Sequence, residues 1–196
     1  MNDKFRIAII GGSEDGKTFL ATGLVRGQWR FHRRRAIVFD PWPGENDWGK
    51  SAWVTDDFEK FRRAVEGTRD CCVVWDEGTH TGGRDRENIK LFTAIRHTHP
   101  AFYFVGHSYA AMLPLMRGSL TGVFMATRDP DDAAEWAKVM VDETIREKAV
   151  RLGKYEFLYK RKHEPARVVK YTPAEIMAGI RVRDASWRAL ARIDVH

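Results

Sequence analysis

Residues 11–18 read Gly11-Gly12-Ser13-Glu14-Asp15-Gly16-Lys17-Thr18, which matches the phosphate-binding pattern G-x-x-x-x-G-K-[ST]. The apolar run that precedes it, Arg6 to Ile10, predicts a buried strand, and the motif itself is expected to open a helix. Glycines let the backbone close around phosphate oxygens, so that successive N–H groups and the helix N-terminus point at the anion. The position of the motif between strand and helix therefore predicts a nucleotide-binding loop.

Two side chains of this motif have separate tasks. Lys17 supplies a positive charge for the β- and γ-phosphates of ATP, and the Thr18 hydroxyl is a ligand for Mg²⁺. The expected nucleotide-binding set is Gly11, Gly12, Ser13, Glu14, Asp15, Gly16, Lys17, Thr18 and the adjoining Phe19.

A second acidic motif ends another apolar run. Residues 71–77 read Cys71-Cys72-Val73-Val74-Trp75-Asp76-Glu77, a buried strand that releases two carboxylates at its C-terminal end. Ligands of open α/β sheets bind at those ends. Asp76 is expected to be the outer-sphere or water-mediated carboxylate of Mg²⁺, and Glu77 to polarise a water for attack on the γ-phosphate. This pair favours hydrolysis over transfer to a substrate hydroxyl.

The whole chain alternates short apolar runs with segments of helical periodicity, which predicts an α/β fold with a mostly parallel central sheet flanked by helices. The five expected parallel strands are Arg6 to Ile10, Ala36 to Phe39, Cys71 to Trp75, Phe102 to Val105 and Val123 to Ala126. We expect a single domain over residues 1–196, with a core over 1–150 and an extension over 151–196.

Helix starts and the extension have their own signals. Thr55 is the expected N-cap of a helix that carries Phe58, Phe61 and Val65 on one face, and Asp129-Pro130 opens a later helix that carries Ala133, Trp136, Ala137 and Met140. Residues 155–159 and 167–171 predict a β-hairpin with a charged turn. Thr172-Pro173-Ala174-Glu175 then predicts a C-terminal helix with the apolar face Ile176, Met177, Ile180 and Trp187.

Composition narrows the class of protein. The 196 residues carry 43% hydrophobic and 31% charged side chains, enough apolar material for a core, and a net charge of +6. A sequence pI near 9.4 makes a polyanionic partner plausible. Cys71 and Cys72 are adjacent, which excludes a disulfide framework and favours a reducing compartment. No stretch approaches the roughly 20 apolar residues of a membrane span or forms a signal peptide, so we expect a soluble, cytoplasmic protein.

Together these residues resemble the FtsK/HerA branch of P-loop ATPases, which includes the RecA-like genome-packaging ATPases of tailless, membrane-containing icosahedral viruses. The resemblance rests on residues 11–18 and 73–77, which are typical of P-loop ATPases generally, and on looser segments. The looser segments are residues 36–41, which end in Asp-Pro, Arg96-His97 before the strand 102–105, and residues 124–129.

The resemblance implies two further functional positions. A polar sensor, commonly Gln, ends the strand that follows the acidic motif in that family, and His107 stands at the corresponding position here. An imidazole can donate one hydrogen bond to a phosphate oxygen or a water, but its charge depends on pH. The family also works in rings, in which an arginine of the neighbouring subunit neutralises charge on the phosphoryl group. Arg96, Arg117 and Arg128 are the candidates, and spacing does not choose among them.

Other signals have a functional and a structural interpretation. The basic clusters 30–35 and 160–162 suit contact with DNA phosphates, or a solvated helix end and a solvated turn. His80, His97 and His99 lack an acid or cysteine at a recognisable ligand spacing, which disfavours a further metal site. Trp42, Trp48 and Trp53 suit a subunit interface or a cover for the sheet.

The resemblance implies an ATPase that forms a homo-oligomeric ring, expected to be a hexamer, and translocates double-stranded DNA into a preformed capsid. The expected location is the host cytoplasm or the packaging vertex of the virion, where capsid-vertex or membrane-associated packaging proteins are candidate partners. Two alternatives remain open: a small P-loop kinase, and a nucleotide-dependent phage assembly ATPase that does not pump DNA. Phosphorylation of an added acceptor would identify the kinase.

Overall fold

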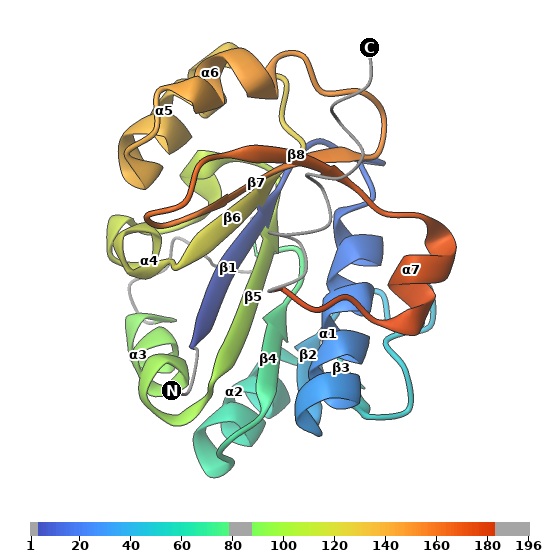
Figure 1. Ribbon diagram of the computed structural model, residues 1–196. Coiled ribbons are helices and arrows are strands. Elements are labelled where there is room, and N and C mark those ends of the chain that lie inside the picture. Colours follow the sequence, from blue (N-terminus) through green and yellow to red (C-terminus); the bar gives the residue numbers. More distant parts are fainter. Residues whose placement is uncertain (1–3, 79–87, 183–196) are drawn as a thin grey trace.

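The computed structural model describes residues 4–78 and 88–182, and within them the strands form one eight-stranded sheet in the order β3-β2-β4-β5-β1-β6-β7-β8 (Figure 1). The strands are β1 (Phe5–Ile10), β2 (Ala36–Phe39), β3 (Ala52–Thr55), β4 (Cys72–Trp75), β5 (Ala101–Gly106), β6 (Gly122–Met125), β7 (Glu156–Arg161) and β8 (Arg167–Lys170). The helices are α1 (Lys17–His32), α2 (Phe58–Gly67), α3 (Asn88–Thr98), α4 (Pro114–Ser119), α5 (Pro130–Met140), α6 (Thr144–Ala149) and α7 (Pro173–Ala178), with a 3₁₀ turn η1 (Tyr109–Ala111).

The sheet is parallel from β3 to β6 and antiparallel at β7 and β8, so the predicted α/β architecture and the antiparallel extension are confirmed. β1 lies between β5 and β6 in the middle of the sheet. Its side chains alternate between two cores: Ile7 and Ile9 pack on the α1 side, whereas Ala8 and Ile10 pack on the opposite side. Burial on both faces is the reason that these strands read as continuous apolar runs.

Figure 1 shows α1 and α7 on one face of the sheet and α2 and α3 on the other. The two core clusters follow these layers, because α1 supplies Leu20 and Leu24 to one and α2 and α3 supply Phe61 and Phe92 to the other. Because these strands are parallel, their carboxyl ends lie at the same side of the sheet. The functional loops follow these ends.

One strand, β3, was not predicted from the sequence. β3 pairs in parallel with β2 at the sheet edge, and Trp53 in its middle is exposed. Because β3 contains Thr55, the prediction of Thr55 as the N-cap of α2 was wrong. Asp57 caps α2 by accepting a hydrogen bond from the Lys60 N–H at 3.0 Å, while the Thr55 hydroxyl accepts one from the Asp57 N–H at 3.1 Å.

The other predicted helix starts are confirmed. Asp129 caps α5 with Pro130 in the first turn, and the predicted apolar face of α5 is buried. Thr172 and Glu175 form the predicted capping box of α7. The C-terminal apolar face needs a correction, because Ile176 and Ile180 are buried whereas Met177 is 48% exposed. Trp187 lies outside the described residues, as does His80.

Within residues 4–78 and 88–182, no helix is both long enough and apolar enough to cross a bilayer.

Candidate nucleotide-binding site

The loop of residues 11–18 leaves the carboxyl end of β1 and enters α1 at the middle of the sheet, as predicted. Gly16 precedes the helix with φ of 83°, in the left-handed region that favours glycine. A Cβ on Gly11 would lie 2.8 Å from the Cβ of Ala126, so this position also requires glycine. These two glycines let the loop turn tightly in front of the helix N-terminus, a place where backbone N–H groups can bind an anion.

Lys17 is held inside this loop. Its side chain is 6% exposed, and Nζ donates a hydrogen bond to the Gly12 carbonyl at 2.7 Å. Burial lowers the pKa of Lys17, and the carboxylates of Glu77, Asp15 and Asp76 act in the opposite direction. The ammonium group is therefore positioned by the backbone, and its charge is supported by three nearby acids.

Asp76, which follows β4, lies close to Thr18 in the first turn of α1. The Thr18 hydroxyl donates to Asp76 Oδ1 at 3.4 Å, and the Glu77 N–H donates to the same oxygen at 2.9 Å. Burial raises the pKa of Asp76 to about 7, and the negative charges of Asp40 and Glu77 add to this rise. A carboxylate so destabilised in its charged form would be stabilised by a cation beside it.

This pair fits Mg²⁺. A hydroxyl and a carboxylate are the hard oxygen ligands that Mg²⁺ takes, and Mg²⁺ commonly binds one or two protein groups together with phosphates. In the part of the chain that the structure describes, no group of three or more His, Cys, Asp or Glu is placed to hold a metal ion.

Glu77, the predicted base, lies beside His107, the predicted sensor. Glu77 Oε2 is 2.9 Å from His107 Nε2, and the side chains are 13% and 28% exposed. The backbone brings them together, because Glu77 has φ of 50° and the following Gly78 N–H donates to the Val105 carbonyl of β5 at 2.9 Å. A Cβ on Gly78 would lie 2.2 Å from the ring of Phe104, so only glycine allows this approach.

The three candidate arginines lie in different places. The Arg96 carbonyl, at the end of α3, accepts hydrogen bonds from the side chains of Lys4 and Arg6, at the amino end of β1 and opposite to the phosphate loop. Arg117 of α4 donates to the Tyr109 carbonyl at 3.0 Å, and its guanidinium carbon lies 3.7 Å from the centre of the Tyr109 ring. Of the three, Arg128 is the one that lies against the phosphate loop of its own chain.

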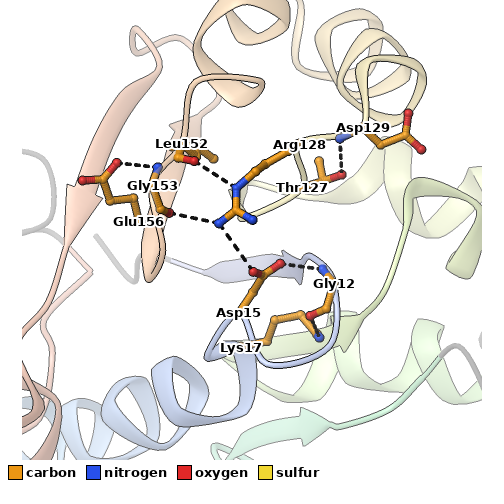
Figure 2. A network of polar contacts seen from close by, with 9 residues as sticks. All are labelled: Gly12, Asp15, Lys17, Thr127, Arg128, Asp129, Leu152, Gly153 and Glu156. Carbon is orange, nitrogen blue, oxygen red and sulfur yellow. Dashed lines mark hydrogen bonds and ion pairs between the residues drawn. The ribbon is translucent and has the colours of Figure 1, made fainter.

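Figure 2 shows how Arg128 joins two segments at this loop. Its Nη2 lies 3.8 Å from Asp15 Oδ1, while Asp15 Oδ2 accepts a hydrogen bond from the Gly12 N–H at 2.7 Å. On its other side, Arg128 Nε donates to the Leu152 carbonyl at 2.9 Å and Nη2 donates to the Gly153 carbonyl at 3.3 Å. Asp15 thus stabilises the loop by a hydrogen bond within it, and Arg128 links the loop to the turn before β7.

Most of the remaining signals have structural roles. His99 is buried, with the Val65 carbonyl at 3.0 Å from one ring nitrogen and the Cys71 N–H donating to the other at 3.3 Å, so both nitrogens are occupied. Lys160 is buried in an ion pair with Asp142 at 3.2 Å. Lys162 donates to the Gly118 carbonyl at 2.9 Å.

In the first basic cluster and among the three tryptophans, some residues make structural contacts and others are exposed. Residues 30–35 surround the end of α1, where Arg30 donates to the Ala178 carbonyl at 2.9 Å and Arg33 provides the C-cap. Trp48 is buried and donates to Asp40 at 2.8 Å, so it covers the sheet. Trp42 and Trp53 are 52% and 46% exposed.

Sequence reasoning gave no functional role to two residues near the site. Asp40 directly follows β2, is fully buried and raises the pKa of Asp76, and its position after the carboxyl end of a buried strand was a usable signal. Tyr155 packs against the phosphate loop, where a Cβ on Gly16 would lie 3.4 Å from its Cδ1. Nothing in the local sequence signals that contact, because it joins residues far apart in the chain.

Strand order, phosphate loop and acidic strand end together define the fold: the chain has a P-loop ATPase fold, which it shares with a viral genome-packaging NTPase and with EssC. No protein-family model matches the sequence, and comparison with curated proteins gives no match.

Three solved structures show this shared fold. The genome-packaging NTPase B204 of Sulfolobus turreted icosahedral virus 2, in complex with AMPPCP, superposes with a TM-score of 0.68 at 17% identity, covering 88% of this chain and 100% of that one. The DNA-packaging ATPase B204 of Sulfolobus turreted icosahedral virus gives 0.67 at 19% identity, with 88% and 100% covered. EssC (ATPases 2 and 3) of Geobacillus thermodenitrificans gives 0.58 at 13% identity, covering 96% of this chain and 44% of that one.

Proposed function

We propose that this protein is an ATP-hydrolysing motor that works as a homo-oligomeric ring and moves double-stranded viral DNA into a preformed capsid. One observation carries the hydrolytic half: Lys17, Thr18, Asp76 and Glu77 converge from two strand ends on one phosphate loop, with Thr18 and Asp76 3.4 Å apart. The packaging half is supported by the shared fold with two viral packaging ATPases.

In the proposed reaction the loop N–H groups and Lys17 bind the phosphates of ATP and withdraw charge from the γ-phosphate. Glu77 accepts a proton from the attacking water through Oε2, the oxygen that contacts His107. His107 orients that carboxylate, which makes it a positioning residue. Thr18 and Asp76 would hold Mg²⁺, which when bound supplies positive charge that neutralises the phosphates.

Positive charge supports both the proposed contact with DNA and the proposed ring. A net charge of +6 suits contact with a polyanion, whose binding weakens as salt rises. An arginine contributed by a neighbouring subunit would complete the site, and Arg96 and Arg117 are the candidates because Arg128 already lies at the loop of its own chain. Host cytoplasm or the packaging vertex is the location that this function requires.

Two variants test the hydrolytic site. Lys17→Ala should abolish turnover and weaken ATP binding, because it removes the cation inside the loop. Glu77→Gln should retain ATP binding but lower the rate of phosphate release by about 10²- to 10⁴-fold, because it removes the base alone. The matched control is Glu66→Gln on the exposed side of α2, which should leave turnover unchanged. Normal turnover in Glu77→Gln would show that another group is the base, and transfer of phosphate to an added acceptor would identify a kinase.

A further inference from the structure

A turn outside the two sequence motifs lies directly on the phosphate loop. Tyr155 precedes β7, and its ring edge packs against Gly16, where a Cβ would lie 3.4 Å from Cδ1 and 3.9 Å from Cε1 of the ring. The side chain is nevertheless 50% exposed. An aromatic ring thus stands at the rim of the loop with half of its surface open.

Three hydrogen bonds hold the turn that contains Tyr155. Arg128 donates to the carbonyls of Leu152 and Gly153, as Figure 2 shows, and the Gly153 N–H donates to Glu156 Oε2 at 2.8 Å. Arg128 also lies 3.8 Å from Asp15 of the phosphate loop. The position of Tyr155 relative to the loop is therefore set by contacts of both segments with one guanidinium group.

Tyr155 has an unfavourable backbone conformation. Its φ is 62°, in the left-handed region that a bulky side chain rarely adopts. Asn or Gly would fit this position with less strain, so an aromatic ring here is not explained by turn geometry. Nor is it explained by burial, because the residue is 50% exposed.

The exposed ring has one cation–π contact, and this interaction is weak. The ammonium group of Lys154 lies 5.1 Å from the centre of the Tyr155 ring. A cation over an exposed ring is held loosely, whereas a nucleic acid base stacked on an aromatic side chain is held more firmly. A base would therefore displace Lys154 from the ring.

We propose that Tyr155 is the stacking platform for the base of the bound nucleotide, and that Arg128 acts as the positioning residue that fixes this platform to the phosphate loop. This inference rests on the proposed nucleotide site. A nucleotide whose phosphates occupy residues 11–18 carries its base one ribose away, within reach of a ring that touches Gly16.

Two ligands separate stacking from phosphate binding. ATP carries a base, whereas tripolyphosphate offers the loop the same phosphates without one. Calorimetric titration with each, in the presence of Mg²⁺, should be made on the full chain and on Tyr155→Asn and Tyr155→Phe. Asn removes the ring and tolerates the left-handed backbone, while Phe keeps the ring.

We expect Tyr155→Asn to weaken ATP binding by about tenfold to hundredfold and to leave tripolyphosphate binding within about twofold of the wild type. Tyr155→Phe should bind both ligands like the wild type. Unchanged ATP binding in Tyr155→Asn, or an equal loss for both ligands, would overturn the stacking role. If the wild-type chain bound neither ligand, the proposed function itself would fail, and the inference with it.

Discussion

Asp76 is the residue at which folding and function oppose each other. Its carboxyl group is 2% exposed between Asp40 and Glu77, and burial raises its pKa to about 7. A cation bound beside it would reverse the cost, so the site is most strained when its charge is uncompensated. Residues that destabilise the fold in this way are typical of binding and catalytic sites.

This conflict predicts a pH effect on stability. An exposed Asp titrates near 3.9 in an unfolded chain, so between about pH 4 and pH 7 the folded state retains a proton that the unfolded state has lost. The stability that Asp76 contributes is therefore full below about pH 4 and is lost as the pH rises through about 7. We expect Asp76→Asn to reduce the fall in the free energy of unfolding between pH 5 and pH 8 by about 2–3 kcal/mol.

Urea unfolding of both proteins at the two pH values, without Mg²⁺ or nucleotide, measures this difference. Titrations of other groups occur in both proteins and largely cancel in the comparison. An identical pH dependence in wild type and Asp76→Asn would contradict the assignment.

The sequence could reveal the residues that act within continuous motifs. Two pairs of neighbours in the sequence are examples, Lys17 with Thr18 and Asp76 with Glu77. Local spacing was enough to predict a role for each pair at the nucleotide site. Tyr155 could not be found in this way, because its role depends on a tertiary contact with Gly16. The pairing of Arg128 with Asp15 has the same character.

At the scale of elements, the close packing of α1 with the segment after α7 requires a glycine at position 27. A Cβ on Gly27 would lie 1.8 Å from the Ile180 carbonyl oxygen, a distance that no side chain can occupy. Four residues earlier, the Ile180 N–H donates to the Gly23 carbonyl at 2.8 Å. The C-terminal segment is thus docked by backbone contact with α1, the helix that begins at the phosphate loop.

We expect Gly27→Ala to lower the free energy of unfolding by about 1–3 kcal/mol, because the displaced segment costs more than the roughly 1 kcal/mol that Ala gains in helix propensity. Gly67→Ala is the matched control, because a Cβ there meets nothing within 4 Å. That control should be neutral or slightly stabilising. Chemical unfolding of the two variants compares them, and equal stability would argue against the close approach.

Elements were predictable where burial was strong. The apolar runs of β1, β4 and β5 reflect strands covered on both faces, and Asp129-Pro130 marked the start of α5. β3 was missed because it is a four-residue edge strand with only Thr55 buried, and its apolar run is only three residues long, Ala52 to Val54. The same strand displaced the predicted start of α2. Met177 was misplaced because α7 ends at Ala178, too soon for a full helical stripe.

At the scale of the whole molecule, the nucleotide site lies at the carboxyl ends of the parallel strands. The first basic cluster, residues 30–35, lies at the opposite side of the sheet. The phosphate loop and Glu77 follow the carboxyl ends of β1 and β4, whereas residues 30–35 lie at the end of the 16-residue α1, about 24 Å away along the helix. DNA contacts at that cluster would therefore be distant from the site of hydrolysis. In the motor that we propose, the ring would couple these two sites.

The central claim is that hydrolysis at this phosphate loop is coupled to DNA. Phosphate release should be measured with and without duplex DNA over a series of salt concentrations, beside a mass measurement of the assembly. We expect duplex DNA to stimulate turnover at low salt, the stimulation to fade as counterions compete for the phosphates, and the mass to correspond to a ring. Turnover that is indifferent to DNA at every ionic strength would contradict the motor and leave an ATPase without a DNA partner.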